Sequence, residues 1–342
     1  ADEVDPAQTD DDYPQKLYNS VLWTGNAAAD RAITGVGFKP DWLWGKVRSS
    51  ADDNWIYDSS RGANRLVTNT DAAAADYSTY WTSFDTDGWT FGSNASSQNL
   101  SSGTFIGRSL RANGGTTSTN SNGSENDTTV QVDPSGGFSI ATWAGSGSTG
   151  TLGHGLSSAP TFYMVKDREN SNPFTVYAEG AGATKYQYLY GNTAFATGAM
   201  WNNTAPTSTV FSVTSNTETN ASGRNYVGYF FANVEGFIKS GSYEGNGNVD
   251  GSFVYTGFRP ALIMTKSVDS TSDWQMFDDT RVGYNVDNNE LKANTTAAEA
   301  TTDMIDILSN GFKLRIATDP NVAETYVYLA MAHNPFKYAT AR

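Results

Sequence analysis

Apolar and polar residues alternate along short stretches of this chain, and clusters of Gly, Asn, Ser and Asp separate the stretches. A period of two predicts half-buried β-strands, because successive side chains of a strand point to opposite faces of its sheet. The segments 88–91, 210–213 and 311–314 are examples. Helix is expected only in two Ala-rich pieces, 71–76 and 296–306. The pattern therefore predicts an all-β protein.

The strand pattern occurs three times, and each copy carries the same marker residues. The markers are an aromatic residue at 23, 143 and 243, glycine at 25, 145 and 245, proline at 40, 160 and 260, and lysine at 46, 166 and 266. Every marker shifts by 120 residues (143 − 23) and then by 100 (243 − 143). Because four independent positions keep one pair of offsets, we interpret the chain as three related units in tandem.

The repeat gives the expected domain organisation. We predict an acidic N-terminal arm at 1–16, β unit 1 at 17–111, a polar linker or long loop at 112–136, β unit 2 at 137–236 and β unit 3 at 237–342. Short strands between turn clusters are typical of an antiparallel β-sandwich or a jelly roll. The segment 112–136 is dominated by Asn, Gly, Ser and Thr, so we expect it to bury no core, although 130–132 could pair as a strand.

Composition and charge narrow the class of protein. The 342 residues include 36 acidic and 22 basic side chains, which gives a formal net charge of -14. Such a surface repels phosphate backbones and anionic lipid headgroups, so we expect neither nucleic acid nor membrane partners. No apolar run approaches the roughly 20 residues of a membrane span. The absence of cysteine fits folding in a reducing cytoplasm and leaves buried area as the source of stability.

Residues suited to metal binding or acid–base catalysis are few. The two histidines, His154 and His333, have no His or Cys neighbour that could complete a metal site, and we interpret both as structural. Calcium is the ion that the acidic loops 52–54 and 269–273 would favour, because it binds carboxylate, amide and carbonyl oxygens. Neither loop matches a defined calcium motif, so no cofactor and no metal ligand is predicted.

An Asp–Arg pair recurs at a fixed distance from the repeat lysine. Asp58 with Arg61 and Asp278 with Arg281 both follow that lysine by the same offset, since 58 − 46 = 12 and 278 − 266 = 12. Unit 2 has alanine at both positions. Recurrence favours a structural role, either a turn-closing aspartate or a surface ion pair. An enzyme would instead specialise one copy, so we predict no catalytic residues and no enzymatic activity.

Two tryptophans are the candidate ligand-binding residues. Trp42 and Trp44 alternate with a leucine, so one face of their strand carries two indole rings. Aromatic faces can stack on the apolar side of a sugar ring. The markers at 23, 143 and 243 recur once in each unit, and for these we expect packing within the core. Trp42 and Trp44 are therefore the more interesting surface.

Six motifs follow one another in order along the chain: GFKPDWLWGK, DSSRG, LGHGLSSAPTFYMVK, GSYEGNG, YTGFRPALIMTK and YLAMAHNPFKYATAR. In this order they resemble the motifs of an uncharacterised domain family of tailed phages of marine and freshwater bacteria. The similarity runs from about Tyr18 to Arg342. The segment 112–136 and the acidic arm depart from the commoner pattern, whereas 334–337 is typical of the family's C-terminus.

The resemblance implies a virion structural protein or tail-fibre protein, made in the host cytoplasm and located on the virion. We expect a non-enzymatic component exposed on the particle, as a tail fibre, head fibre or capsid decoration that contributes to host attachment. Other virion proteins are the expected partners. The alternatives are a carbohydrate-binding receptor module that holds host surface glycans and, below it, a polysaccharide depolymerase. A homotrimer is the expected assembly, and a monomeric pseudo-trimer is its alternative.

Overall fold

The computed structural model describes residues 16–93, 97–133, 136–281 and 289–332. Over these ranges the fold is all-β, as predicted, and the strands are antiparallel and grouped in three sandwich-like units. The 3₁₀ turn η2 (Glu179–Ala181) is short, and the described residues contain no helix of the length and apolar character that a membrane span requires. His333, most of the acidic arm and the segment 334–337 lie outside the described residues.

Each unit consists of one large sheet and one small sheet. In unit 1 the large sheet has the order β1-β9-β3-β4-β5-β6 and the small sheet the order β2-β8-β7. The strands are β1 (Tyr18–Thr24), β2 (Ala32–Thr34), β3 (Trp42–Val47), β4 (Asn54–Asp58), β5 (Gly62–Val67), β6 (Ala75–Asp76), β7 (Trp81–Asp85), β8 (Gly88–Phe91) and β9 (Thr104–Leu110). The last strand of the unit thus pairs between the first and third, which brings the two ends of the unit together.

Units 2 and 3 repeat this order. Their large sheets are β10-β11-β12-β19-β14-β15-β16-β17 and β20-β28-β22-β23-β24-β25, and their small sheets are β13-β18 and β21-β27-β26. The strands of unit 2 are β10 (Ser118–Asn120), β11 (Thr128–Asp133), β12 (Phe138–Ala144), β13 (Gly150–Gly153), β14 (Pro160–Asp167), β15 (Thr175–Ala178), β16 (Lys185–Tyr188), β17 (Ala196–Thr197), β18 (Val210–Val213) and β19 (Asn225–Ala232). Those of unit 3 are β20 (Ile238–Glu244), β21 (Phe253–Tyr255), β22 (Pro260–Ser267), β23 (Gln275–Asp278), β24 (Asn289–Lys292), β25 (Ala300–Thr301), β26 (Ile305–Leu308), β27 (Gly311–Leu314) and β28 (Thr325–Ala332).

The repeat seen in the sequence is also a repeat of strand register. Residues 44, 164 and 264 lie in the strand that ends near the repeat lysine, and they pair with Arg108, Tyr229 and Leu329. In units 2 and 3 the marker proline begins the strand, where its missing N–H leaves no gap in the ladder beyond a local register shift. The three units can therefore be compared position by position.

The segment 112–136 corrects the expectation of a linker without a core and confirms the alternative that 130–132 pairs as a strand. Two strands, β10 and β11, lie within it, and β11 pairs with β12 and so extends the large sheet of unit 2. Val130 is buried in the core of that unit, together with Trp143 and Leu152. The alternation around Val130 outweighs the polar composition, so the segment belongs to unit 2.

The two Ala-rich pieces are not helical, which corrects the second expectation about local structure. Residues 71–76 and 296–306 run as extended loops that contain β6, β25 and the start of β26. Each loop uses its backbone to bond the neighbouring unit, and a helix would have consumed those amide groups internally. Tertiary pairing therefore overrides the helix preference of alanine here.

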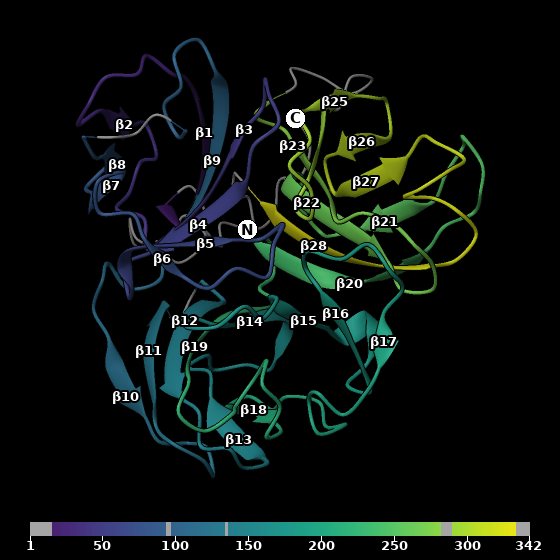
Figure 1. Cartoon of the computed structure of the whole chain (residues 1–342). Coiled ribbons are helices and arrows are strands. Elements are labelled where there is room, and N and C mark those ends of the chain that lie inside the picture. Colours follow the sequence, from purple (N-terminus) through teal and green to yellow (C-terminus); the bar gives the residue numbers. More distant parts are fainter. Residues whose placement is uncertain (1–15, 94–96, 134–135, 282–288, 333–342) are drawn as a thin grey trace, which may run out of the picture.

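The three units form a closed ring around a common centre (Figure 1). Equivalent backbone hydrogen bonds join each unit to the next. In each case the donor is the amide just before the edge strand β6, β17 or β25, and the acceptor is the carbonyl two residues after the repeat lysine of the next unit. The bonds run from Ala74 N to Arg168 O (2.8 Å), from Phe195 N to Val268 O (3.0 Å) and from Glu299 N to Arg48 O (2.9 Å). Unit 1 thus bonds unit 2, unit 2 bonds unit 3, and unit 3 returns to unit 1.

A shared hydrophobic core fills the centre of the ring. One face of each large sheet packs against the small sheet of its own unit, as Trp23 and Trp89 do in unit 1. The opposite face packs against the other units, and Trp42, Phe138 and Tyr229 meet there with ring centroids about 6 Å apart. All six residues of β3 are buried as a result. The units therefore share buried area that none of them has alone.

Candidate functional site

The repeat lysines are buried at the junctions between units. Lys46 Nζ donates to Asp52 O and to Thr296 O, the second acceptor belonging to unit 3. Lys166 Nζ likewise donates to Asn172 O and to Asp71 O of unit 1. The acceptors are backbone carbonyls, so each of these two lysines fixes the turn that follows its own strand and a loop of the neighbouring unit.

In unit 3 the third lysine is used differently. Lys266 Nζ donates to Ser267 O and Ser270 O, both in its own unit. The neighbouring loop of unit 2 is instead held by a backbone bond from Ser272 N to Asn192 O (2.8 Å). Burial lowers the pKa of all three repeat lysines to about 8. Each ammonium group donates to backbone carbonyl oxygens, and we assign the three lysines a structural role.

The Asp–Arg pair of unit 3 lies at the interface with unit 1. Asp278 Oδ2 accepts hydrogen bonds from Arg281 Nε and from Arg108 of β9, each at 2.8 Å. All three side chains are fully buried. Burial opposes the charge of Asp278, but the two guanidinium groups outweigh it and lower the pKa of the carboxyl group. Arg281 also reaches Glu299, which pairs with Arg48 of unit 1, so the interface is a network of charges.

The equivalent pair of unit 1 lies at the interface with unit 2. Asp58 Oδ2 accepts from Arg61 Nε at 2.6 Å and from the hydroxyl of Tyr229 at 2.5 Å, and Arg61 Nη2 donates to the same hydroxyl at 3.1 Å. Asp58 Oδ1 accepts the Arg61 amide, which closes the turn after β4. The prediction of a turn-closing aspartate is confirmed. The prediction of a surface ion pair is wrong, because ring closure buries both side chains completely.

The third interface is apolar. In unit 2, Ala178 and Ala181 replace the Asp–Arg pair, and η2 lies against β20 and β28 of unit 3. The residue of β28 that is equivalent to Arg108 and Tyr229 is Leu329, which is buried in the central core with Ala178. Each interface therefore combines two positions of one unit with one position in the last strand of the next. The Asp–Arg pair meets Arg108 or Tyr229 at two interfaces, and two alanines meet Leu329 at the third.

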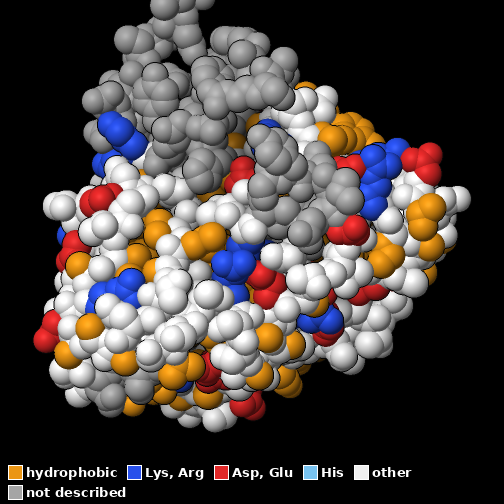
Figure 2. All heavy atoms as spheres, turned by 90° about the horizontal axis from the view of Figure 1, so that it is seen from above, with side chains coloured by type: hydrophobic (Ala, Val, Ile, Leu, Met, Phe, Trp, Pro, Cys, Tyr) orange, Lys and Arg blue, Asp and Glu red, His pale blue; other side chains and the backbone are white. Residues whose placement is uncertain are grey.

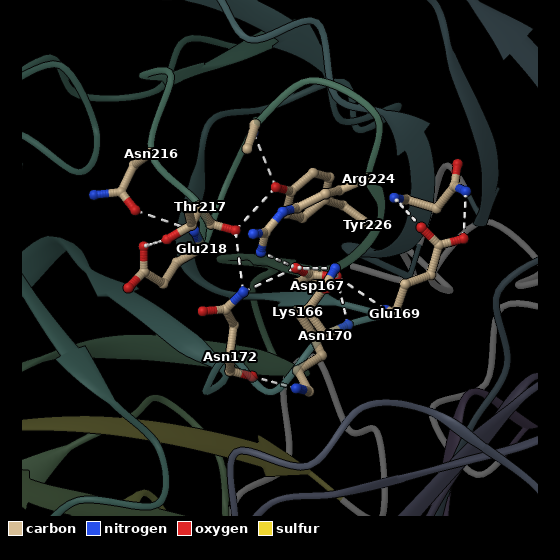
Figure 3. A network of polar contacts seen from close by, with 12 residues as sticks. Lys166, Asp167, Glu169, Asn170, Asn172, Asn216, Thr217, Glu218, Arg224 and Tyr226 are labelled. Carbon is tan, nitrogen blue, oxygen red and sulfur yellow. Dashed lines mark hydrogen bonds and ion pairs between the residues drawn. The ribbon is translucent and has the colours of Figure 1, made fainter.

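A polar network surrounds the turn between β14 and β15 (Figure 3). Asp167 Oδ1 accepts the amides of Glu169 (2.9 Å) and Asn170 (3.1 Å), and Oδ2 accepts from Asn172 (2.8 Å) and Arg224 (2.7 Å). Burial disfavours the carboxylate, but these hydrogen bonds outweigh burial and lower the pKa of Asp167. A carboxylate held by four donors is poorly suited to proton transfer. The network fixes the turn.

His154 is buried in the turn after β13, in agreement with the structural role expected for it. Its Nδ1 accepts from the amide of Leu156 (3.1 Å), so the proton is on Nε2, which donates to Thr207 O (3.1 Å). Burial lowers the pKa of His154 from 6.5 to about 4. The neutral form is thus the one that the fold holds.

The shifted pKa of His154 predicts acid sensitivity. In the unfolded chain the imidazole takes up a proton as the pH falls through 6.5, whereas the folded protein resists until about 4. Stability is therefore lost as the pH falls through that window, by about 2 kcal/mol at pH 5. In His154→Asn the amide oxygen keeps an acceptor for the Leu156 N–H near the position of Nδ1, and the side chain does not titrate. Urea unfolding at pH 7 and pH 5 should show a smaller loss for His154→Asn than for the wild type, and equal losses would contradict the prediction.

The acidic loops considered for calcium have other partners. Asp53 Oδ1 accepts from Asn69 (2.9 Å), and Asp273 pairs with Lys292 (2.7 Å) and accepts from Asn294. Within the ranges that the structure describes, no group of three or more His, Asp or Glu side chains could hold a metal ion. The carboxylate oxygens of the two loops thus accept hydrogen bonds that hold the turns in place.

The structure corrects the interpretation of Trp42 and Trp44. Their exposed fractions are 2% and 3%, because the face of β3 that carries both rings is the one that meets unit 2. An indole side chain buried between the three units cannot stack on a sugar. The sequence showed which side of the strand was aromatic, but whether that side met solvent depended on the association of the units.

Two aromatic residues of unit 3 are exposed on the same face of one strand. Phe253 and Tyr255 of the edge strand β21 are 48% and 64% exposed, and the intervening Val254 is buried. Beside Tyr255 is a pocket of about 300 Å³, lined also by Lys239 of β20 and Glu235 of the preceding loop. On the right of Figure 2, where unit 3 lies, hydrophobic side chains are exposed next to acidic and basic ones. We call Phe253, Tyr255 and this pocket the unit 3 patch.

The fold and its sites thus define an all-β protein of three ring-forming units, whose buried polar groups join the units. The chain belongs to the family described as Domain of unknown function (DUF7483), which it matches over residues 13–335. No curated protein and no solved structure gave a significant match. The family match covers all three units, so the ring lies within one family domain.

Proposed function

We propose that the protein is a non-enzymatic structural component exposed on a phage particle, as a tail fibre, head fibre or capsid decoration, and that it contributes to host attachment. The observation that carries the proposal is the use of the recurring polar residues. Asp58, Asp278 and the repeat lysines bind backbone or neighbouring units, which leaves their carboxylates and amines unavailable for chemistry. The resemblance of the sequence motifs to those of a tailed-phage family supports the setting.

The ring also bears on assembly. Each unit uses one surface to meet the next unit and another to receive the previous one, and the third contact returns to unit 1. A single chain therefore provides the interactions that three copies would provide in a homotrimer. This supports a monomeric pseudo-trimer, with other virion proteins as partners and with neither nucleic acid nor membrane bound by so acidic a chain.

Cryo-microscopy of the particle that encodes this chain tests the proposal. We expect density for a three-unit β ring on the exterior of the head or tail. Mass spectrometry of purified particles should detect the chain in stoichiometric amounts. A particle that lacks the chain, or that carries it only in the interior, would overturn the proposal.

A carbohydrate-binding receptor module is the second candidate function. The specific observation in its favour is the unit 3 patch, where two aromatic side chains are exposed beside a pocket with charged lining. Trp42 and Trp44 give it no support, because both are buried. The two candidates are compatible, since a structural component on a particle can also hold a host glycan.

A further inference from the structure

The three units provide internal controls for the unit 3 patch. Strand pairing makes Ile33, Leu152 and Val254 equivalent, because they face Trp89, Phe211 and Phe312 across the small sheet. The outward positions on either side are Ala32 and Thr34 in unit 1, Thr151 and Gly153 in unit 2, and Phe253 and Tyr255 in unit 3. Unit 3 alone places two aromatic rings where its relatives have small or polar side chains.

A residue that lines the pocket, Lys239, also differs from its equivalents in the other units. Pairing with the last strand makes Asn19, Ser139 and Lys239 equivalent, since each follows a residue that faces 110, 231 or 331. Asn19 Nδ2 donates to Gly35 O and Val36 O at 3.3 and 3.0 Å. These bonds tie the first strand of unit 1 to the loop that follows β2.

In unit 2 an equivalent hydrogen bond ties the first strand to the corresponding loop. Ser139 Oγ donates to His154 O, in the loop that follows β13. In unit 3 the corresponding loop contains Thr256 and Gly257, and both residues line the pocket together with Lys239. Lys239 Nζ has no hydrogen bond or ion pair with any residue that the structure describes. The side chain that bonds this loop in units 1 and 2 is thus replaced in unit 3 by a lysine that lines the pocket.

The lining has the chemistry of a sugar site. Lys239 donates and Glu235 accepts hydrogen bonds, and the hydroxyl groups of a sugar can do both, so the pair suits an uncharged polyol. The ring of Tyr255 forms one wall and is extended along β21 by Phe253, about 7 Å away along the strand. A volume of about 300 Å³ is at the lower end of ligand pockets and accommodates one pyranose ring.

We propose that the unit 3 patch binds a neutral oligosaccharide, with one pyranose ring in the pocket against Tyr255 and a neighbouring sugar on Phe253. The net charge of -14 favours an uncharged glycan over an acidic one. The inference rests on the proposed attachment function in one respect: that function makes the host surface the source of the glycan. Binding itself depends on the patch alone.

Binding of the full chain to an array of neutral and acidic oligosaccharides, built from glucose, galactose, mannose and N-acetylglucosamine, tests the proposal. We expect binding to at least one neutral glycan, followed by titration calorimetry with the best one. Tyr255→Thr, which installs the residue of unit 1, should weaken binding at least about tenfold. Lys239→Asn should weaken it comparably, because asparagine can bond the loop and close the pocket as in unit 1.

Tyr190→Ala is the matched control, because Tyr190 is an exposed tyrosine of unit 2 that does not line the pocket. It should bind like the wild type, and the melting temperatures of all variants should agree. Absence of binding to neutral glycans, preference for acidic glycans, or equal binding by Tyr255→Thr would overturn the proposal. These results are independent of cryo-microscopy: a chain absent from particles can still bind the glycan, and a chain on particles can fail to bind it.

Discussion

Replacing Asp278 with alanine is expected to lower the free energy of unfolding by about 3–5 kcal/mol. The carboxylate is fully buried and neutralises Arg281 of its own unit and Arg108 of unit 1. Without it, two buried guanidinium groups lie close together in the interface with no carboxylate between them. Urea unfolding followed by tryptophan fluorescence measures the loss. Asp250→Ala is the control, because Asp250 is 78% exposed and pairs with Lys313 at the surface, and this variant should unfold like the wild type.

The apolar interface of the ring supplies a second variant for the same test. Asp278→Ala combined with Arg281→Ala and Arg108→Leu reproduces the set Ala178, Ala181 and Leu329. Replacing fully buried charged partners together by hydrophobic residues is often neutral or stabilising. The remaining carboxylate, Glu299, keeps its ion pair with Arg48. The triple variant should therefore recover most of the stability that Asp278→Ala loses. A triple variant no more stable than the single one would contradict the equivalence of the three interfaces.

Truncating Trp42 to alanine is expected to cost about 3–5 kcal/mol. The ring lies in the central core, with centroids 5.8 Å from Trp44, 5.8 Å from Tyr229 and 6.0 Å from Phe138. Its removal leaves a cavity between units 1 and 2, and packing around the ring limits relaxation. Phe253→Ala removes an exposed aromatic ring and should change the free energy of unfolding little. A Trp42→Ala variant as stable as wild type would place this ring at the surface after all.

The repetition of the same strands in each unit was predictable, and the reason is physical. Strand register is fixed by which face of a sheet is buried, and the repeat preserves that pattern in all three copies. The markers at 46, 166 and 266 consequently take equivalent places at the ends of β3, β14 and β22. Composition misled at 112–136, because alternation over a few residues around Val130 sufficed to pair β11 with β12.

The association of the units was not predictable from local pattern. Alternation shows that Trp42 and Trp44 share a face, but a face that meets solvent and a face that meets another sheet have the same period. The neighbouring Leu43 offered a signal, since a strand that is apolar at consecutive positions is commonly buried on both sides. Likewise, the offset of Asp58 and Arg61 showed recurrence but carried no information about burial.

Departures from the repeat were the signal for the unit 3 patch. Once units are aligned, Lys239 stands where Asn19 and Ser139 stand, and Tyr255 stands where Thr34 and Gly153 stand. Positions that match across units serve packing, whereas exposed positions that differ in one unit are free to serve binding. The marker residues indicate what the units share, and they carry no information about the exposed positions at which unit 3 differs.

Differential scanning calorimetry of the full chain tests most directly whether the three units form one ring with a shared core. We predict a single transition whose calorimetric enthalpy equals the van't Hoff enthalpy. Asp278→Ala should move that whole transition to lower temperature. Separate transitions for the units, with the substitution shifting only one of them, would contradict the account.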